Sequence, residues 1–198
     1  MSIPDQDRTE ARRQQVLDAA AECFHKSGFH GASMAQIAKA ARMSPGHIYN
    51  LFENKDDVIG TIVEREQAER LAKVDAIQRA DDVVRAMIDE VECGVEDHLA
   101  GPNAALRMEV LAEAGRNPKL AAVVRNADAL GREKLVGLME VALAQRNRQR
   151  SAQEVRARVE VLMALFDGLM VRTLRNPDID RETITPVVAR LVKALLDE

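Results

Sequence analysis

The sequence predicts an all-α fold, because composition, residue preference and apolar spacing lead to the same conclusion. Of the 198 residues, 46% are apolar and 30% are charged, a balance typical of a soluble globular protein. Aromatic residues make up only 3%, and Ala, Leu, Val, Arg and Glu dominate, which favours helices over strands. From about residue 55 onward, apolar residues recur at helical spacing and no strand pattern occurs.

Two short helices open the predicted fold. Residues 8–27 place apolar side chains at helical spacing, and Gly28 follows at the position where glycine commonly ends a helix. A second helix is predicted over about 33–40, because Ser33 is followed three residues later by Gln36, the pattern of a capping box.

A third short helix is predicted within the stretch MSPGHIYNLFENK, over about 44–51. Asn54 can then cap a long helix that begins at Lys55. Because only a short turn joins the second helix to the third, the two match a helix-turn-helix module over about 33–52.

Breaker residues divide the rest of the chain into further helices. The interruptions are the sequences GPN, RNP, QRNRQRS and a second RNP. The helices predicted between them cover residues 55–79, 81–100, 103–115, 118–146, 151–175 and 180–197. We find no low-complexity linker, so two domains, 8–54 and 55–198, should be joined directly through the helix that begins at Lys55.

The last two predicted helices, about 151–175 and 180–197, carry more apolar surface than one core-facing stripe requires. Val161, Met163 and Leu165 widen the stripe of the first, and the second repeats the pattern. A helix with surplus apolar surface has a second surface to cover, so we expect a two-fold homodimer formed by these helices. The alternative is a thick internal core.

Charge is distributed unevenly along a chain whose net charge is −4. Residues 8–55 hold seven Lys and Arg against four Asp and Glu, whereas residues 56–198 hold 21 against 26. This asymmetry suggests an anion-binding module attached to an acidic body.

Several classes of site and location are excluded by what the sequence lacks. No apolar run is long enough to span a bilayer, and the N-terminus carries no signal-peptide pattern, so we expect a cytoplasmic protein. Cys23 and Cys93 lie in helical apolar patterns without metal-ligand spacing, which predicts buried, reduced thiols, no metal site and no cofactor.

The segment LDAAAECFHKSGFHGASMAQIAKAARMSPGHIYNLFENKDDVI, residues 17–59, closely resembles the DNA-binding segment of the tetracycline-repressor (TetR) family. The positions in register include an Ala-Ala-x-x-x-Phe run, Gly28-Phe29, Ser33-Met34, Ile37-Ala38, Ser44, Gly46, Ile48-Tyr49, Phe52 and Lys55. The all-helical remainder agrees with the family in size and helix number. One departure is Arg42, where many relatives carry glycine; if this turn needs a positive φ, arginine should be strained by about 1 kcal/mol.

The resemblance implies that the helix beginning after Ser44 is the recognition helix. Ser44 can cap it, Pro45 suits its first turn, and Gly46 has no side chain to hold the backbone away from DNA. The candidates for contacts with base edges are Pro45, His47 and Asn50. The candidates for phosphate contacts are Ser33, Arg42, Ser44, Tyr49 and Lys55. Tyr49 could instead be a half-buried core residue, and Lys55 could be a plain surface charge.

A small-molecule effector is also implied by the resemblance, in a pocket among the helices of the C-terminal domain. The candidate lining residues are Met87, Val91, Met108, Leu111, Met139, Met163, Phe166 and Met170, any of which could equally be plain core. Asp167 shares a stripe with methionines, where a charge needs a partner such as Arg107 or a cationic ligand group. An internal ion pair or solvent exposure is the alternative. Beyond residue 52 Phe166 is the only aromatic residue, which favours an aliphatic or compact ligand.

The sequence therefore predicts a dimeric DNA-binding transcriptional regulator, a repressor released from a palindromic operator by a small-molecule effector. A DNA-organising protein that uses the same module without a ligand is the alternative. An enzyme is not expected, because the sequence shows no paired carboxylates at fixed spacing, no nucleophile with a base and no glycine-rich phosphate loop.

Overall fold

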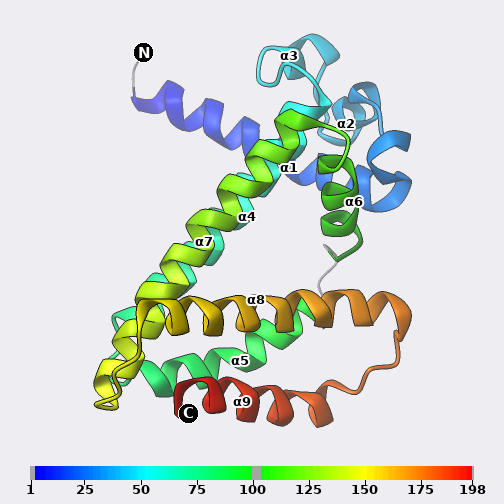
Figure 1. Ribbon diagram of the computed structural model, residues 1–198. Helices are drawn as coiled ribbons and strands as arrows, with labels where there is room; N and C mark the ends of the chain where they lie inside the picture. Colours follow the sequence, from blue (N-terminus) through cyan, green and yellow to red (C-terminus); the bar gives the residue numbers. More distant parts are fainter. Residues whose placement is uncertain (1–2, 100–103, 198) are drawn as a thin grey trace. The chain divides into compact units, whose positions relative to one another are not determined.

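The computed structural model describes residues 3–99 and 104–197, and all regular secondary structure in these ranges is α-helical, which confirms the predicted fold class (Figure 1). The helices are α1 (Ile3–Gly31), α2 (Met34–Ala40), α3 (Pro45–Tyr49), α4 (Lys55–Gln78), α5 (Val83–Leu99), α6 (Ala104–Ala114), α7 (Pro118–Gln145), α8 (Ala152–Arg175) and α9 (Arg181–Asp197). None of the helices in these ranges is long and apolar enough to cross a bilayer.

The helix limits differ from the predicted ones chiefly at two places. The first helix begins at Ile3 instead of residue 8, and it continues to Gly31 across a break at Gly28, where φ is 72° and ψ is 165°. The third helix is shorter than predicted and ends at Tyr49. The predicted helix end at residue 100 and start at residue 103 lie outside the described ranges.

Residues pack into two compact units, and each contains segments that are distant in sequence. The first unit comprises Met1–Glu66 and Ala105–Ala127, and the second comprises Gln67–Ala104 and Asp128–Glu198. Most of α6 and the start of α7 therefore pack with the N-terminal helices. Helical periodicity reveals which face of a helix is buried but not against which segment, so the domain boundary near residue 55 stays a prediction.

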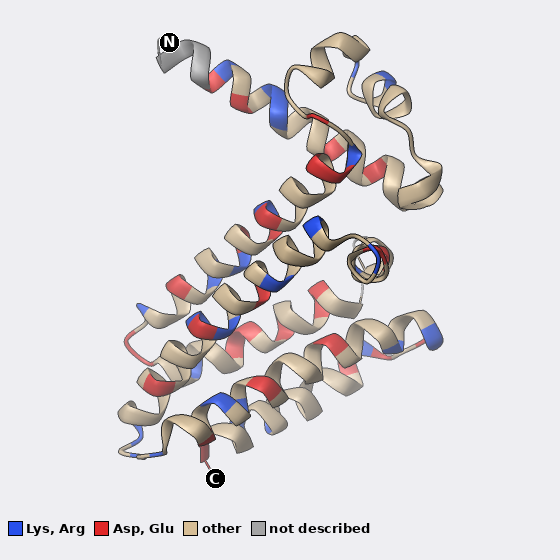
Figure 2. Ribbon diagram, turned by 45° about the horizontal axis from the view of Figure 1, so that its top comes forward, with Lys and Arg blue, Asp and Glu red and all other residues tan. Residues whose placement is uncertain are grey.

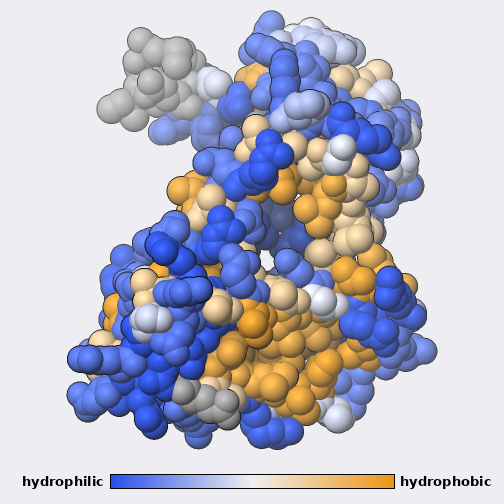
Figure 3. All heavy atoms as spheres, in the orientation of Figure 1, coloured by the Kyte–Doolittle hydropathy of each residue, from blue (hydrophilic) through white to orange (hydrophobic). Residues whose placement is uncertain are grey.

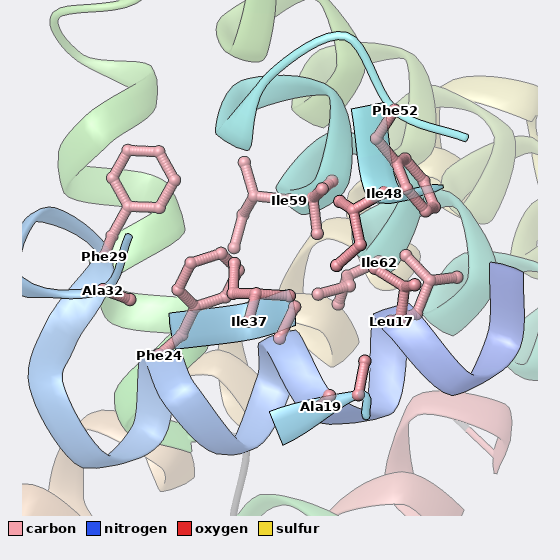
Figure 4. Close-up of a cluster of buried hydrophobic side chains, with 14 of the residues drawn as sticks. Leu17, Ala19, Phe24, Phe29, Ala32, Ile37, Ile48, Phe52, Ile59 and Ile62 are labelled. Carbon is pink, nitrogen blue, oxygen red and sulfur yellow. The ribbon is translucent and has the colours of Figure 1, made fainter. Parts of the chain in front are cut away.

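The core of the first unit joins side chains from α1 to α4. Phe24, Ile37 and Ile48 converge with Phe52 and Ile59, and all five are at most 1% exposed (Figure 4). Because each of the short helices contributes a fully buried residue, the helix-turn-helix is held together by burial of large apolar side chains and not by helix length.

The core of the second unit lies between α5, the second half of α7, α8 and α9. Helix α5 contacts both α8 and α9, and its buried face includes Met87, Val91 and Val95. The buried residues of α8 are Val155, Val159, Leu162, Leu169 and Met170, and those of α9 are Val188, Val192 and Leu196. One apolar stripe of α8 and one of α9 are thus buried within the unit.

The turn between α2 and α3 is closed by a Schellman motif. The Arg42 N–H donates to the Lys39 carbonyl over 3.2 Å, and the Met43 N–H donates to the Ala38 carbonyl over 2.9 Å. This motif requires a left-handed residue after the helix cap. Arg42 adopts that conformation with φ 54°, so the turn keeps the glycine-like geometry that the resemblance implies although it lacks the glycine.

Replacing Arg42 with glycine should raise the free energy of unfolding by about 0.5–1 kcal/mol, since the left-handed region costs an L-residue about 1–2 kcal/mol and glycine gives part of that back to the unfolded state. Asn147 occupies the same position after α7 with φ 53° and provides a matched control. Asparagine tolerates this region better than arginine does, so Asn147→Gly should gain less. Urea denaturation of both variants tests this, and an equal or larger gain for Asn147→Gly would contradict it.

Candidate nucleic-acid interface

Helix α3 exposes its N-terminal end and buries one side chain. Ser44 caps the helix by accepting the His47 N–H over 3.3 Å, which confirms the predicted cap. Ile48 is fully buried, while Pro45, Gly46 and His47 are exposed. Helix α3 contains no Lys, Arg, Asp or Glu, as Figure 2 shows. Backbone amides and uncharged side chains therefore form the exposed end of this helix.

Gly46 is not required by the packing of the protein itself. A Cβ built on Gly46 would meet no atom within 4 Å, and its backbone does not lie in the left-handed region. A larger residue would thus fit within the described chain. Packing within the described residues therefore does not explain why residue 46 lacks a side chain.

Tyr49 and Asn50 lie on the exposed side of the same segment. Tyr49 is 56% exposed, so the half-buried core position considered for it is wrong. Asn50 is the C-cap residue of α3 and is exposed. Both side chains can therefore reach a partner that contacts α3.

The two serines predicted to contact phosphate differ in the state of their hydroxyl groups. Ser33 forms a complete capping box with Gln36: its Oγ accepts the Gln36 N–H and donates to Gln36 Oε1 over 3.0 Å. The Ser44 Oγ accepts the His47 N–H, which leaves its hydroxyl hydrogen able to donate outward. Of the two, Ser44 is the better phosphate donor in this geometry.

Lys55 lies against the protein instead of projecting as a surface charge. Its Nζ donates to the Phe29 carbonyl over 2.5 Å and to the Ala32 carbonyl over 3.0 Å, and lies 4.5 Å from the centroid of the Phe29 ring. The plain surface charge considered for Lys55 is therefore wrong. Its phosphate contact stays a prediction, and these two hydrogen bonds leave the third donor of the ammonium group for it.

Two side chains of α1 hold the helix-turn-helix, and sequence reasoning missed both. The Arg13 Nη1 donates to the Leu51 carbonyl over 2.6 Å, and its guanidinium lies 4.4 Å from the centroid of the Phe52 ring. The Gln15 Nε2 donates to the Ala41 carbonyl over 2.8 Å. Periodicity gives no signal for such contacts, because it reports only which positions are apolar.

The residues predicted to line an effector pocket are divided between the two units. Met87, Val91, Met139 and Met170 are buried in the second unit, where Met163 and Phe166 are partly buried. Arg107, Met108 and Leu111 belong to the segment that packs with the first unit. The Phe166 ring lies 5.2 Å from the His98 ring and packs closely over Gly94.

The expected charge pairing in that pocket is corrected by the structure. Arg107 Nε donates to Glu66 Oε2 over 3.2 Å, within the first unit. Asp167 is exposed, so its charge is hydrated and needs no internal partner. Helical spacing placed Asp167 on the apolar stripe of α8, but α8 presents that part of its surface to solvent.

The cysteines also differ from expectation. Cys23 is only partly buried and Cys93 is exposed, because the buried faces of α1 and α5 do not include them. Burial, followed by the charge of Glu22, raises the pKa of the Cys23 thiol. Within the described ranges, no group of His, Cys, Asp and Glu is arranged to hold a metal ion.

Family profiles match both parts of the chain. The profile for "Bacterial regulatory proteins, tetR family" matches residues 16–62, which include α2 and α3. The profile for "BetI-type transcriptional repressor, C-terminal" matches residues 76–197, more than half of the chain.

Individual relatives agree with these profiles. The transcriptional regulator UidR of Escherichia coli K12 is 35% identical over 128 residues, and the match spans 62% of each chain. Among solved structures, Salmonella enterica GusR superposes with a TM-score of 0.76 at 25% identity, covering 95% of this chain and 96% of GusR. Bacillus subtilis FadR in complex with stearoyl-CoA superposes with a TM-score of 0.76 at 17% identity, covering 90% and 96%, which shows a shared fold.

The exposed, capped end of α3, the packing of α1 to α4 around it and the two profile matches agree. Together they confirm that the N-terminal segment is a helix-turn-helix DNA-binding module. The matched family and the named relatives are transcriptional regulators and not enzymes. The chain belongs to the TetR family of bacterial transcriptional regulators.

Proposed function

We propose that this regulator binds a palindromic operator as a homodimer, represses transcription there, and is released when a small molecule enters its second unit. The observation that carries the proposal is the exposed end of α3, where a serine cap, an unobstructed Gly46 and exposed His47 present backbone amides and short side chains. Such an end suits phosphate, and its first residues suit base edges in the major groove.

Arg42 adds a positive charge beside this helix end. It is exposed and holds a left-handed conformation that glycine would adopt at lower cost. Because glycine would adopt this conformation at lower cost, the arginine side chain is expected to have a function here. Contact with a DNA phosphate is such a function. Pro45, His47 and Asn50 then remain the proposed base-facing residues, while Ser44, Tyr49 and Arg42 contact the backbone of DNA.

Dimerisation is supported by the apolar surface of α8 and α9. Large apolar side chains remain exposed on both helices: Val161 by 56%, Leu174 by 51%, Val187 by 41% and Leu191 by 48%. Figure 3 shows apolar side chains gathered over these two helices of the second unit. A self-complementary patch on a helix pair suits a two-fold interface, which would also place two recognition helices on one operator.

The effector is proposed to be largely apolar. The interior of the second unit is built from Val, Leu and Met, and its single aromatic residue is Phe166. FadR, which has the same fold, was crystallised with stearoyl-CoA, so a long-chain acyl group is a suitable first probe.

A ligand that binds the second unit should raise the melting temperature and weaken operator binding together, because it stabilises only the state that binds it. We suggest stearoyl-CoA as the probe, free coenzyme A as its control, and thermal unfolding and operator affinity as the measurements. A shift with stearoyl-CoA alone supports an apolar effector. A confirmed ligand that leaves operator affinity unchanged would contradict release and favour the DNA-organising alternative.

A further inference from the structure

The backbone of Phe29 is held by charged side chains from two other helices. Its N–H donates to the Glu109 carboxylate of α6. Its carbonyl accepts from Lys55 Nζ, at the start of α4, and the same ammonium group lies over its ring. We call these three residues the Phe29 clasp, and all belong to the first unit.

Gly28 makes the clasp possible. Its φ of 72° turns the chain out of the helical path, so that the next N–H points toward α6. A Cβ on Gly28 would lie 3.1 Å from Glu109 Oε1, closer than ordinary contact. A side chain at residue 28 would therefore oppose both the backbone conformation and the approach of Glu109.

The clasp joins the two ends of the helix-turn-helix segment, which we call its base. Ala32 directly precedes Ser33, the cap of α2, and Phe29 lies three residues before Ala32. Lys55 begins α4, after the turn that follows α3. Because Lys55 donates to both carbonyls, it joins the two chain ends between which α2 and α3 lie. Glu109 then connects this joined base to α6 through a charge-assisted hydrogen bond.

We infer that Glu109 is a positioning residue for DNA binding: through the Phe29 clasp, α6 fixes the base of the helix-turn-helix and so the placement of α3. The inference rests on the proposed function, because it assumes that α3 enters DNA. It deepens that function by identifying the contact through which a change at α6 would alter operator affinity. Sequence reasoning gave no indication of it, since 80 residues separate the two partners.

The clasp can be tested with three variants and DNA selected from a random pool by the wild-type protein. Glu109→Ala removes the acceptor, Glu109→Gln keeps an amide oxygen that can accept the Phe29 N–H, and Glu113→Gln is the matched control. Glu113 lies one turn further along α6 and contacts the side chains of His30 and Arg116 instead of the Phe29 backbone. Those contacts, Arg116 first, lower the pKa of Glu113, so the control removes a carboxylate that is ionised at neutral pH.

Two measurements are made on each variant: amide hydrogen exchange at Phe29 without DNA, and affinity for the selected DNA. Selective labelling with ¹⁵N-phenylalanine gives four backbone signals, few enough to assign Phe29 by substitution. Glu109→Ala should speed exchange at Phe29 and lower DNA affinity about tenfold, a typical effect for a residue that acts on a binding site without touching the ligand. Glu109→Gln and Glu113→Gln should stay within about threefold of wild type.

Other outcomes would overturn the inference in distinguishable ways. Unchanged Phe29 exchange in Glu109→Ala would show that the clasp does not hold this amide. Faster exchange with unchanged DNA affinity would show that Glu109 has only a structural role. Equal losses of DNA affinity in Glu109→Ala and Glu113→Gln would show that the negative charge of α6, and not the Phe29 clasp, affects DNA binding. A wild-type protein that selects no DNA would overturn the proposed function, and the positioning role with it, whatever the exchange data show.

Discussion

Replacing Leu191 with glutamate should convert the proposed dimer into a folded monomer and abolish tight operator binding. Leu191 is 48% exposed on α9, whereas its neighbour Val192 is buried in the core. A substitution at Leu191 should therefore leave the packing of the core intact. Burial of a leucine contributes about 1.5–3 kcal/mol, and a two-fold axis doubles the effect of one substitution. The dimer should therefore weaken by a factor of at least about 100, before the cost of burying two like charges is added.

Lys193→Glu is the matched control, because Lys193 is an exposed and already charged residue of the same helix. It should leave assembly unchanged. Val161→Glu should behave like Leu191→Glu, since Val161 is 56% exposed on α8. Sedimentation at micromolar concentration and circular dichroism provide the test: wild-type monomer, or a dimer that survives both apolar substitutions, would show that α8 and α9 are not the interface.

Helix positions could be predicted from the sequence because they follow from local rules. Glycine, proline and serine caps mark the ends, and apolar spacing marks the faces, so the limits of α4, α8 and α9 lie close to the predicted ones. The buried Ile48 and the exposed His47 follow from the same periodicity. Even the positive φ of Arg42 was accessible, through the glycine that the family carries there.

Contacts of long polar side chains could not be predicted in this way. Lys55 was expected to face solvent or phosphate, yet it binds two carbonyls of the α1–α2 joint. Arg13 and Glu109 likewise bind backbone groups of distant segments. Which carbonyl or amide lies within reach depends on tertiary packing, and one sequence carries no information about it. Asp167 shows the converse, since helical spacing placed it on an apolar stripe that is partly exposed.

At α3 we expect some residues to contact base edges and others to contact phosphates. His47 is exposed on the first turn, and its neighbour Ile48 is buried, so the His47 side chain faces away from the core. Arg42 is exposed in the turn before α3, and its proposed partner is the backbone of DNA. Removing a base contact changes sequence preference, whereas removing a phosphate contact weakens all sequences alike.

His47→Ala should relax preference at one or two positions in each half-site, by about 1–3 kcal/mol against the wrong base, and leave the salt dependence of binding unchanged. Arg42→Gly should weaken operator and scrambled DNA equally and lower the salt slope by about one phosphate contact per subunit, because released counterions produce that slope. Arg42 is a better probe of phosphate contact than Lys55, since Lys55→Ala would also break the Phe29 clasp. Binding to the operator, its single-base variants and scrambled DNA at several salt concentrations separates the two effects. If Arg42→Gly changes sequence preference while His47→Ala weakens every sequence equally, α3 enters the groove in a different orientation from the one proposed.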